Sequence, residues 1–459
     1  MKKMPSVAAL ALACCLPLHA NANESDEIKQ LKQQLQQAQA MMQSMQDRLQ
    51  QLENQQQQTS QAVAAVQATP PAPAPVATPS SSNGAGFNPK IAMILGGTYS
   101  NLSQDPADYH LQGFAPGGEE VGPGDRSFNL GESEMTITAN VDPDWYGQLT
   151  LAVAADDSIS AEEDLVRTTS LPHGLTLELG RFFSGVGYIN QQHAHAWDFV
   201  DAPLVYQAMF GGQYETEGAQ LKWLAPTDTF LEFGVEAGNG TNYPGGDRNS
   251  NGIGATTAFF SAGDDIGDSA SWKAGMSWLH TNPDGRSYED EDSLGNFVSN
   301  SFNGSSDTLG ANFVWKWAPN GNNTQQNLKV QGEYFSRTDD GTMTFDTFGS
   351  AIPGDYNADP SGWYLQSVYQ FMPNWRVGVR RDQLYGGNAD FGNTLNPADF
   401  PVLANYNPTR NSLMFDYSPS EFSRFRLQFA QDKSSPDATD NEIMLQYIMS
   451  LGTHGAHSF

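Results

Sequence analysis

Residues 425–431 read FRLQFAQ, a short stretch in which apolar and polar side chains alternate. Its two faces are Phe425, Leu427 and Phe429 on one side, and Arg424, Arg426 and Gln428 on the other. Successive side chains of a β-strand point to opposite faces, so a period of two predicts a strand with one apolar and one polar face. The same alternation returns within residues 145–155, 307–318 and 326–338. The sequence therefore predicts an all-β domain.

Extended from Phe87 to the C-terminus, the pattern predicts sixteen strands. They are residues 91–100, 127–141, 145–155, 161–170, 175–182, 218–225, 229–238, 252–263, 269–280, 307–318, 326–338, 362–372, 375–385, 410–418, 422–432 and 440–451. Short turns alternate with long polar segments near 101–126, 183–217, 239–251, 281–306, 339–360 and 386–409. An even strand number, strands of about ten residues and long loops on one rim are typical of outer-membrane barrels. We therefore predict a sixteen-stranded antiparallel transmembrane β-barrel over residues 87–459, since a soluble sandwich would not keep this loop alternation in phase.

Three other segments precede the predicted barrel. Residues 1–22 have two lysines, an apolar run and an Ala-Asn-Ala ending, which predicts a secretory signal peptide. Residues 23–54 place Ile, Leu, Met and Ala at both core positions of a heptad repeat and predict a short coiled-coil helix in the periplasm. Residues 55–86 are rich in Gln, Ala and Pro and predict a linker. The only two cysteines lie in the signal segment, so the mature chain has no disulfide chemistry.

The charge and the motifs exclude several classes of function. The net charge is −29, from 52 acidic and 23 basic side chains, and such a surface repels nucleic acid. No Ser-His-Asp spacing predicts a hydrolase, and the Gly-rich stretches lack a strand-to-helix phosphate cradle. The chain is therefore predicted not to be an enzyme.

The segment 183–217 is a long connection that is rich in aromatic residues, and such a connection is usually functional when it is not disordered. We predict that it folds into the barrel as a constriction loop. Its candidate residues are Tyr188, His193, His195, Trp197, Asp198 and Asp201.

His193 and His195 also suggest a metal site, because side chains two residues apart share one side of an extended backbone. They could hold a divalent metal together with Asp198 or Asp201, although the spacing fixes only the pair and zinc requires three or four ligands. The alternative is that both rings hydrogen-bond the loop to the barrel wall beside Trp197. No other cofactor is predicted.

Charged residues at inward positions are predicted to tune which solutes pass. The candidates are Arg181, Lys222, Lys329, Glu333, Arg380, Arg424 and Arg426. Two acidic groups, residues 289–292 and the pair Asp339 and Asp340, are assigned to solvated outer loops. Alternatively, divalent cations would link these carboxylates to lipopolysaccharide.

Five stretches resemble the phosphate-selective porin O and P superfamily, within it the branch of siderophore-porin or zinc-regulated outer-membrane proteins. They are residues 178–207, 221–236, 313–323, 417–429 and 445–459. The resemblance implies a trimeric sixteen-stranded channel whose third outer loop folds into the lumen. The final stretch, ending in Phe459, resembles the closing strand that the barrel assembly machinery recognises. The acidic chain departs from the Arg and Lys ladders expected of phosphate porins, which argues against phosphate selectivity.

Together these features predict an outer-membrane channel in contact with lipid and lipopolysaccharide, with passive or substrate-selective uptake of small solutes. One alternative is specific uptake of a metal ion or metal-siderophore complex. Another is a structural anchor whose periplasmic coiled coil contacts the cell wall.

Overall fold

The computed structural model describes residues 89–118, 121–131, 133–154, 158–246 and 248–452. The chain divides into two compact units, Met1–Ala85 and Gly86–Phe459, and the description concerns the second. The predicted signal peptide, coiled coil and linker lie outside the described residues. Within the described ranges, no helix is long and apolar enough to cross a membrane.

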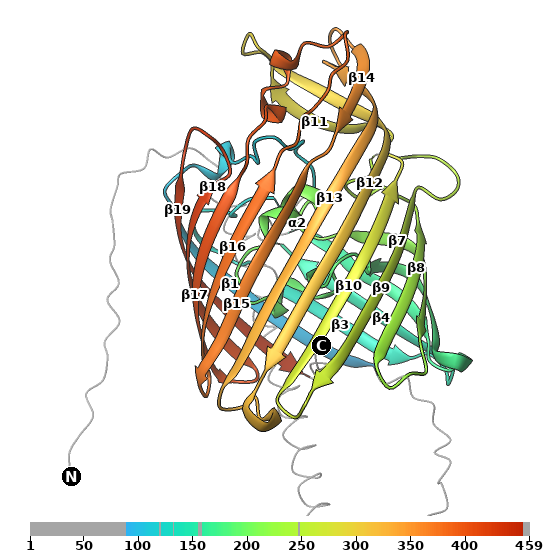
Figure 1. Ribbon diagram of the computed structural model, residues 1–459, viewed down its shortest axis with the longest axis vertical. Coiled ribbons are helices and arrows are strands. Elements are labelled where there is room, and N and C mark those ends of the chain that lie inside the picture. Colours follow the sequence, from blue (N-terminus) through green and yellow to red (C-terminus); the bar gives the residue numbers. More distant parts are fainter. Residues whose placement is uncertain (1–88, 119–120, 132, 155–157, 247, 453–459) are drawn as a thin grey trace, which may run out of the picture. The chain divides into compact units, whose positions relative to one another are not determined.

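The described residues form one closed antiparallel sheet (Figure 1). It closes where β1 (Lys90–Leu102) pairs with β19 (Asp440–Gly452), with Ala92 opposite Gly452. Between them lie β3 (Ser133–Asn140), β4 (Trp145–Val153), β5 (Ile159–Thr168), β6 (Leu175–Phe183), β7 (Glu215–Leu224), β8 (Phe230–Gly238), β9 (Ala255–Ile266), β10 (Ala270–Thr281), β12 (Phe297–Trp317), β13 (Asn327–Phe345), β15 (Ser361–Met372), β16 (Trp375–Tyr385), β17 (Thr409–Ser420) and β18 (Ser423–Lys433). These sixteen strands confirm the predicted barrel.

Three short strands add to the barrel: β2 (Ser127–Asn129), β11 (Arg286–Glu291) and β14 (Ile352–Ala358). The described helices are η1 (Pro106–Asp108), η2 (Pro172–Gly174), η3 (Ile189–Gln191), η4 (Ala194–Ala196), α2 (Leu204–Phe210), η5 (Pro319–Gly321), η6 (Pro397–Asp399) and η7 (Pro401–Leu403). The predicted strand 127–141 is thus divided into β2 and β3.

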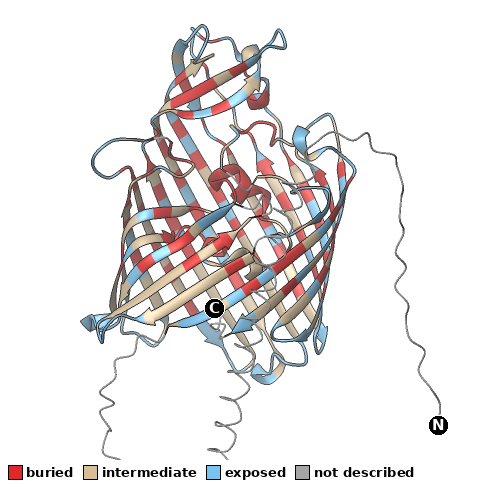
Figure 2. Ribbon diagram, turned by 180° about the vertical axis from the view of Figure 1, so that it is seen from behind, coloured by how far each residue is buried: buried red, intermediate tan, exposed pale blue. Residues whose placement is uncertain are grey.

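Strand β18 shows how the alternating sequence builds the wall. Arg426 and Gln428 are buried on its inner face, whereas Phe425 and Phe429 on its outer face are 43% and 39% exposed. Phe425 lies opposite Tyr447 of β19, which is also exposed. Figure 2 shows this banding of buried and exposed positions along the strands. The wall therefore has an apolar outside and a polar inside, the arrangement that a membrane barrel requires.

Two segments predicted as polar loops, 281–306 and 339–360, are instead largely strand. β12 and β13 continue beyond the barrel and pair with β11 and β14 at the top of Figure 1. Their inner surfaces bury an apolar cluster that includes Phe302, Met343 and Tyr356. Asp339 is also buried, between Arg286 at 3.1 Å and Arg337 at 3.2 Å, so the prediction of a solvated carboxylate is wrong for this residue.

The main apolar core lies inside the barrel and is built from its loops. Every residue of α2 is buried, and Leu204, Tyr206 and Met209 have no exposed surface. These side chains pack with Phe114 of the first outer loop and Phe335 of the wall. Figure 1 shows α2 within the ring of strands.

Candidate functional site

The candidate site is the segment between β6 and β7, residues 184–214, which is called the inner loop below. Its two ends are tied together by Asn190. The Asn190 side-chain amide donates to the carbonyl oxygens of Ser184 (2.9 Å) and Tyr214 (2.8 Å), and its oxygen accepts from the Tyr214 N–H (2.7 Å). These bonds fix the base of the loop, so the rest of it projects as one unit.

The first attachment of the inner loop to the wall is made by two glutamates. Glu236 of β8 accepts hydrogen bonds from the Ser184 hydroxyl (2.6 Å) and the Gly185 N–H (2.8 Å). Glu333 of β13 accepts from the N–H groups of Tyr188 (2.7 Å) and Ile189 (3.0 Å). The predicted lumen residue Glu333 therefore holds the backbone of the loop.

Glu333 also accepts from two buried phenols, Tyr206 of α2 at 3.0 Å and Tyr364 of β15 at 2.7 Å. Nearby, Gly187 has a φ of +73°, and a Cβ there would lie 2.3 Å from the Tyr206 hydroxyl. Only glycine fits this conformation and this space. The turn at Gly187 thus lets two parts of the loop share one carboxylate.

A second attachment is a group of two loop histidines and three wall glutamates, called the His–Glu cluster: His193, His195, Glu134, Glu162 and Glu163. Nδ1 of His193 lies 3.1 Å from Glu134 and 3.2 Å from Glu162, and its Nε2 lies 3.0 Å from Glu163. Nδ1 of His195 lies 2.6 Å from Glu134. The imidazole rings are stacked, with centroids 5.6 Å apart.

A β-bulge brings two consecutive glutamates into the cluster. Thr150 of β4 pairs with Glu163, but the next residue, Leu151, pairs with Ala161, so Glu162 is an extra residue on β5. A bulge sets two residues of one strand against one of its partner and redirects side chains. Both Glu162 and Glu163 consequently reach His193 from the same wall.

The charge state of His193 follows from its neighbours. Burial alone would lower the pKa of His193, but its hydrogen bonds with Glu134, Glu162 and Glu163 outweigh burial and raise that pKa well above the ordinary value. In the absence of another cation, His193 is therefore an imidazolium among carboxylates.

The predicted metal partners Asp198 and Asp201 do not join this cluster, because they turn to basic residues elsewhere on the wall. Asp198 is ion-paired with Lys329 of β13 and with Arg376 of β16, the latter at 3.1 Å. It also accepts a hydrogen bond of 3.1 Å from Gln366. Burial raises the pKa of Asp198, but the two cations outweigh it and hold that pKa well below its usual range.

Asp201 is held in the same way by the next strands. Its carboxylate lies 3.0 Å from Arg380 of β16 and 2.7 Å from Arg410 of β17, and it accepts a bond of 2.6 Å from Gln428 of β18. Burial again opposes ionisation, and Arg380 and Arg410 outweigh it to lower the pKa of Asp201. Asp198 and Asp201 with Lys329, Arg376, Arg380 and Arg410 are called the Asp–Arg network below.

Trp197 lies between the His–Glu cluster and the Asp–Arg network. Its carbonyl oxygen accepts hydrogen bonds from Arg426 (2.8 Å) and Arg424 (3.3 Å), and its indole N–H donates to the Gln192 carbonyl (2.9 Å). Arg424 also donates to the carbonyl of His195 at 3.3 Å. The predicted lumen residues Arg424 and Arg426 thus support the loop backbone.

Two further charged residues predicted to face the lumen, Lys222 and Arg181, lie on different faces of the wall. Lys222 lies on the inner face of β7, two residues from the buried Gln220. Arg181 lies on the outer face of β6, since it pairs with the exposed Asp164 and shares its face with Leu179, which is 37% exposed. It is ion-paired with Glu217 on the same face. The assignment of Arg181 to the lumen is therefore wrong.

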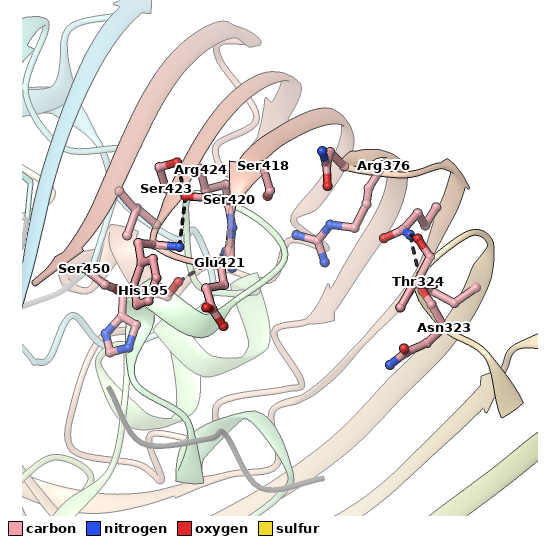
Figure 3. A pocket seen from close by; sticks show the side chains of 15 residues that line it. His195, Asn323, Thr324, Arg376, Ser418, Ser420, Glu421, Ser423, Arg424 and Ser450 are labelled. Atoms are coloured by element: carbon pink, nitrogen blue, oxygen red, sulfur yellow. Dashed lines mark hydrogen bonds between the residues drawn. The ribbon is translucent and has the colours of Figure 1, made fainter. Parts of the chain in front are cut away.

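Two recesses lie against the inner loop on the side of the short turns. One, of about 510 Å³, is lined by His195, Arg376, Arg424 and polar turn residues such as Asn323 and Ser420 (Figure 3). The other, of about 650 Å³, is lined by Asp198 together with Lys316, Lys329 and Arg376. The His–Glu cluster, through His195, and the Asp–Arg network, through Asp198 and Arg376, therefore each border a polar recess.

Similarity to other proteins supports the fold. No family model matches the chain. A loop-deletion mutant of OmpT, an outer membrane protein of Vibrio cholerae, superimposes with a TM-score of 0.50 over 79% of this chain and 99% of its own, at 9% identity. At this level of identity, the similarity shows a shared fold only. The outer membrane channel DcaP of Acinetobacter baumannii is 12% identical and covers 80% of this chain and 98% of its own, with a TM-score of 0.48.

In sequence, an uncharacterized protein of Aquifex aeolicus (strain VF5) is 27% identical over 398 residues, which are 81% of this chain and 80% of that protein. The comparisons thus support the closed β-barrel fold, and membership of the phosphate-selective superfamily and its siderophore or zinc branch stays a prediction.

Proposed function

We propose that this chain is an outer-membrane channel for small solutes and that the inner loop narrows its lumen. The observation that carries the proposal is the spread of the loop's contacts, which reach the inner faces of β3, β5, β8, β13, β16, β17 and β18. A loop fixed at so many points of the wall sets the free cross-section by its own position.

The outer surface of the barrel wall favours a position in the outer membrane. A closed sheet leaves no strand edge whose unpaired backbone N–H and C=O groups would face lipid, and its exposed apolar side chains suit contact with acyl chains. The same fold serves as a channel in DcaP, which favours a channel over a catalyst here. A trimer, as in one form of OmpT, and contacts with lipopolysaccharide and the assembly machinery belong to the same proposal.

The recesses suggest how solutes reach the constriction. Lys316 of β12 lies directly opposite Lys329 of β13, and Arg376 lines the same recess. Like charges opposite one another on a sheet repel, so an arriving anion is favoured there. Asp198, Asp265 and Asp268 line the same recess, so three carboxylates face three basic groups there. We therefore propose that this recess admits small solutes of either charge.

The experiment is single-channel recording from purified protein in planar bilayers. Wild-type protein is expected to conduct in discrete steps, and replacing residues 186–212 by a short Gly-Ser linker is expected to raise the conductance several-fold. Shortening the exposed turn at residues 292–296, between β11 and β12, is the control and leaves the conductance unchanged. If neither the wild type nor the loop-deleted barrel conducts, the structural-anchor alternative replaces the channel.

A further inference from the structure

We propose that His193, His195 and Glu134 form a site for a first-row divalent metal ion of the zinc type, with Glu162, which lies at the same Nδ1 of His193 as Glu134, as a further ligand. The ion would fasten the inner loop to strands β3 and β5. This site does not depend on solute conduction, so it can be tested separately from the channel.

The spacing of the donor atoms carries the proposal. One ligand atom from each of Glu134, His193 and His195 lies within 4.8 Å of the other two. Ligand atoms around a four-coordinate zinc ion, each at about 2 Å from the metal, lie roughly 3.3 Å from one another. His193 Nδ1 is already 3.1 Å from Glu134 and 3.2 Å from Glu162. Small side-chain rotations therefore suffice to admit an ion.

The charge balance favours a cation at this place. The cluster sets three carboxylates against two imidazoles, so even with both rings protonated one negative charge remains. The Glu134 side chain is only 2% exposed, and burying uncompensated carboxylates is unfavourable. The partners of Glu134 are the two histidines, while Glu163 also accepts from Gln148 and Thr150. A dication held by neutral imidazoles would replace the two ring protons and supply the same positive charge to the carboxylates.

The types of ligand atom in the cluster indicate which class of metal it would bind. Imidazole nitrogens suit zinc and its first-row neighbours, whereas calcium and magnesium prefer oxygen-only ligands. The recess of about 510 Å³ that His195 borders is lined largely by polar residues, including Glu421, and reaches the cluster through His195 (Figure 3). The structure thus provides both the ligands and a route.

A protonated His193 among glutamates would produce the same contacts without a metal, so the test must separate a proton from a metal ion. Full-length protein, purified in detergent and freed of metal with a chelator, is titrated with Zn²⁺ by calorimetry and with Co²⁺ by visible absorption. The wild type is expected to bind one ion per chain and to give the Co²⁺ bands of a low-coordinate site. Ca²⁺ and Mg²⁺ are expected not to compete.

The variants assign the site to these residues. H193A/H195A is expected to lose binding, and E134Q, which keeps the size of the side chain, is expected to weaken it at least tenfold. H280A is the matched control, because His280 makes its own contact with Asp307 outside the cluster. The faster migration of the folded barrel in unheated gels, compared with the heated and unfolded chain, shows that each variant is folded.

The outcomes are distinct. A folded wild type that binds no Zn²⁺, or H193A/H195A binding with unchanged affinity, overturns the proposal. Conductance that persists in either case leaves the channel intact, whereas Zn²⁺ binding by a protein that does not conduct rejects the channel and keeps the site.

Discussion

Two of the inner loop's attachments to the barrel wall, the Asp–Arg network and the His–Glu cluster, are chemically opposite. At the Asp–Arg network the loop supplies carboxylates and the wall supplies guanidinium groups. At the His–Glu cluster the loop supplies imidazoles and the wall supplies carboxylates. Arginine is charged at every physiological pH, whereas the cluster takes its positive charge from solution, either as protons on its histidines or as a bound metal ion. The comparison indicates one permanent attachment and one conditional attachment of the same loop.

The largest effect is expected from breaking the permanent attachment. The double variant D198N/D201N leaves Arg376, Arg380 and Arg410 without their loop partners. Removing one side of a buried ion pair costs about 3–5 kcal/mol, because the remaining charge is still buried. We expect a pronounced fall in the temperature at which the folded barrel converts to the slower-migrating unfolded form in gels. D307N, at an exposed pair, is the control and should leave this temperature unchanged.

Removing Glu333, the carboxylate that two parts of the loop share, is expected to have a smaller effect. E333A deprives the N–H groups of Tyr188 and Ile189 of their acceptor, and each buried unsatisfied group costs about 1–3 kcal/mol. We expect a lower unfolding temperature and frequent current fluctuations in single-channel records. A wild-type unfolding temperature together with a single-channel record free of such fluctuations would show that Glu333 does not hold the loop.

The conditional attachment is expected to respond to metal. At a Zn²⁺ concentration one hundred times the dissociation constant, a site present only in the folded state adds about 2.7 kcal/mol of stability. Zinc should therefore raise the unfolding temperature of the wild type but not that of H193A/H195A. An equal zinc response in both proteins would contradict this expectation.

The permanent attachment is expected to be insensitive to mild acid. The pKa of Asp198 is lowered on folding, so its contribution is complete above its ordinary pKa of about 4 and is lost only as the pH falls through the lower folded-state value. The fall in unfolding temperature that D198N causes should therefore be the same at pH 7 and at pH 5. A fall that shrinks steadily over this range would mean that Asp198 is not held as described.

The smallest effect is expected at Arg181, on the outer face of β6. Its pair with Glu217 is part-exposed, and such surface pairs contribute about 0–1 kcal/mol. R181Q should leave the reversal potential in a salt gradient unchanged, whereas R376Q, at the recess, should shift it toward cations. An equal shift for both would return Arg181 to the lumen.

The strands could be predicted from the sequence because the alternation of apolar and polar residues that marks each strand depends only on residues that are neighbours in the chain. The same rule also contradicts the assignment of Arg181, which is three residues from the inward Glu178 and so lies on the opposite face. The strand extensions around Phe302 and Tyr356 were missed because their sequences are polar, and the apolar cluster they cover forms only when distant loops meet.

The contacts of the inner loop could be predicted only in part. Residues 184–214 and their two histidines stand out by composition, but their partners lie far away in the chain. Arg410 is more than two hundred residues from Asp201, and the pairing depends on the closed barrel. The β5 bulge that turns both Glu162 and Glu163 inward leaves no mark in a strict alternation of residues.

The most direct test is the single-channel conductance of D198N/D201N beside that of the wild type under identical salt. If the inner loop narrows the lumen and the Asp–Arg network holds it there, the variant will conduct several-fold more current and approach the barrel that lacks residues 186–212. A folded D198N/D201N barrel with wild-type conductance would contradict the account, because the loop would then not depend on this attachment to narrow the channel.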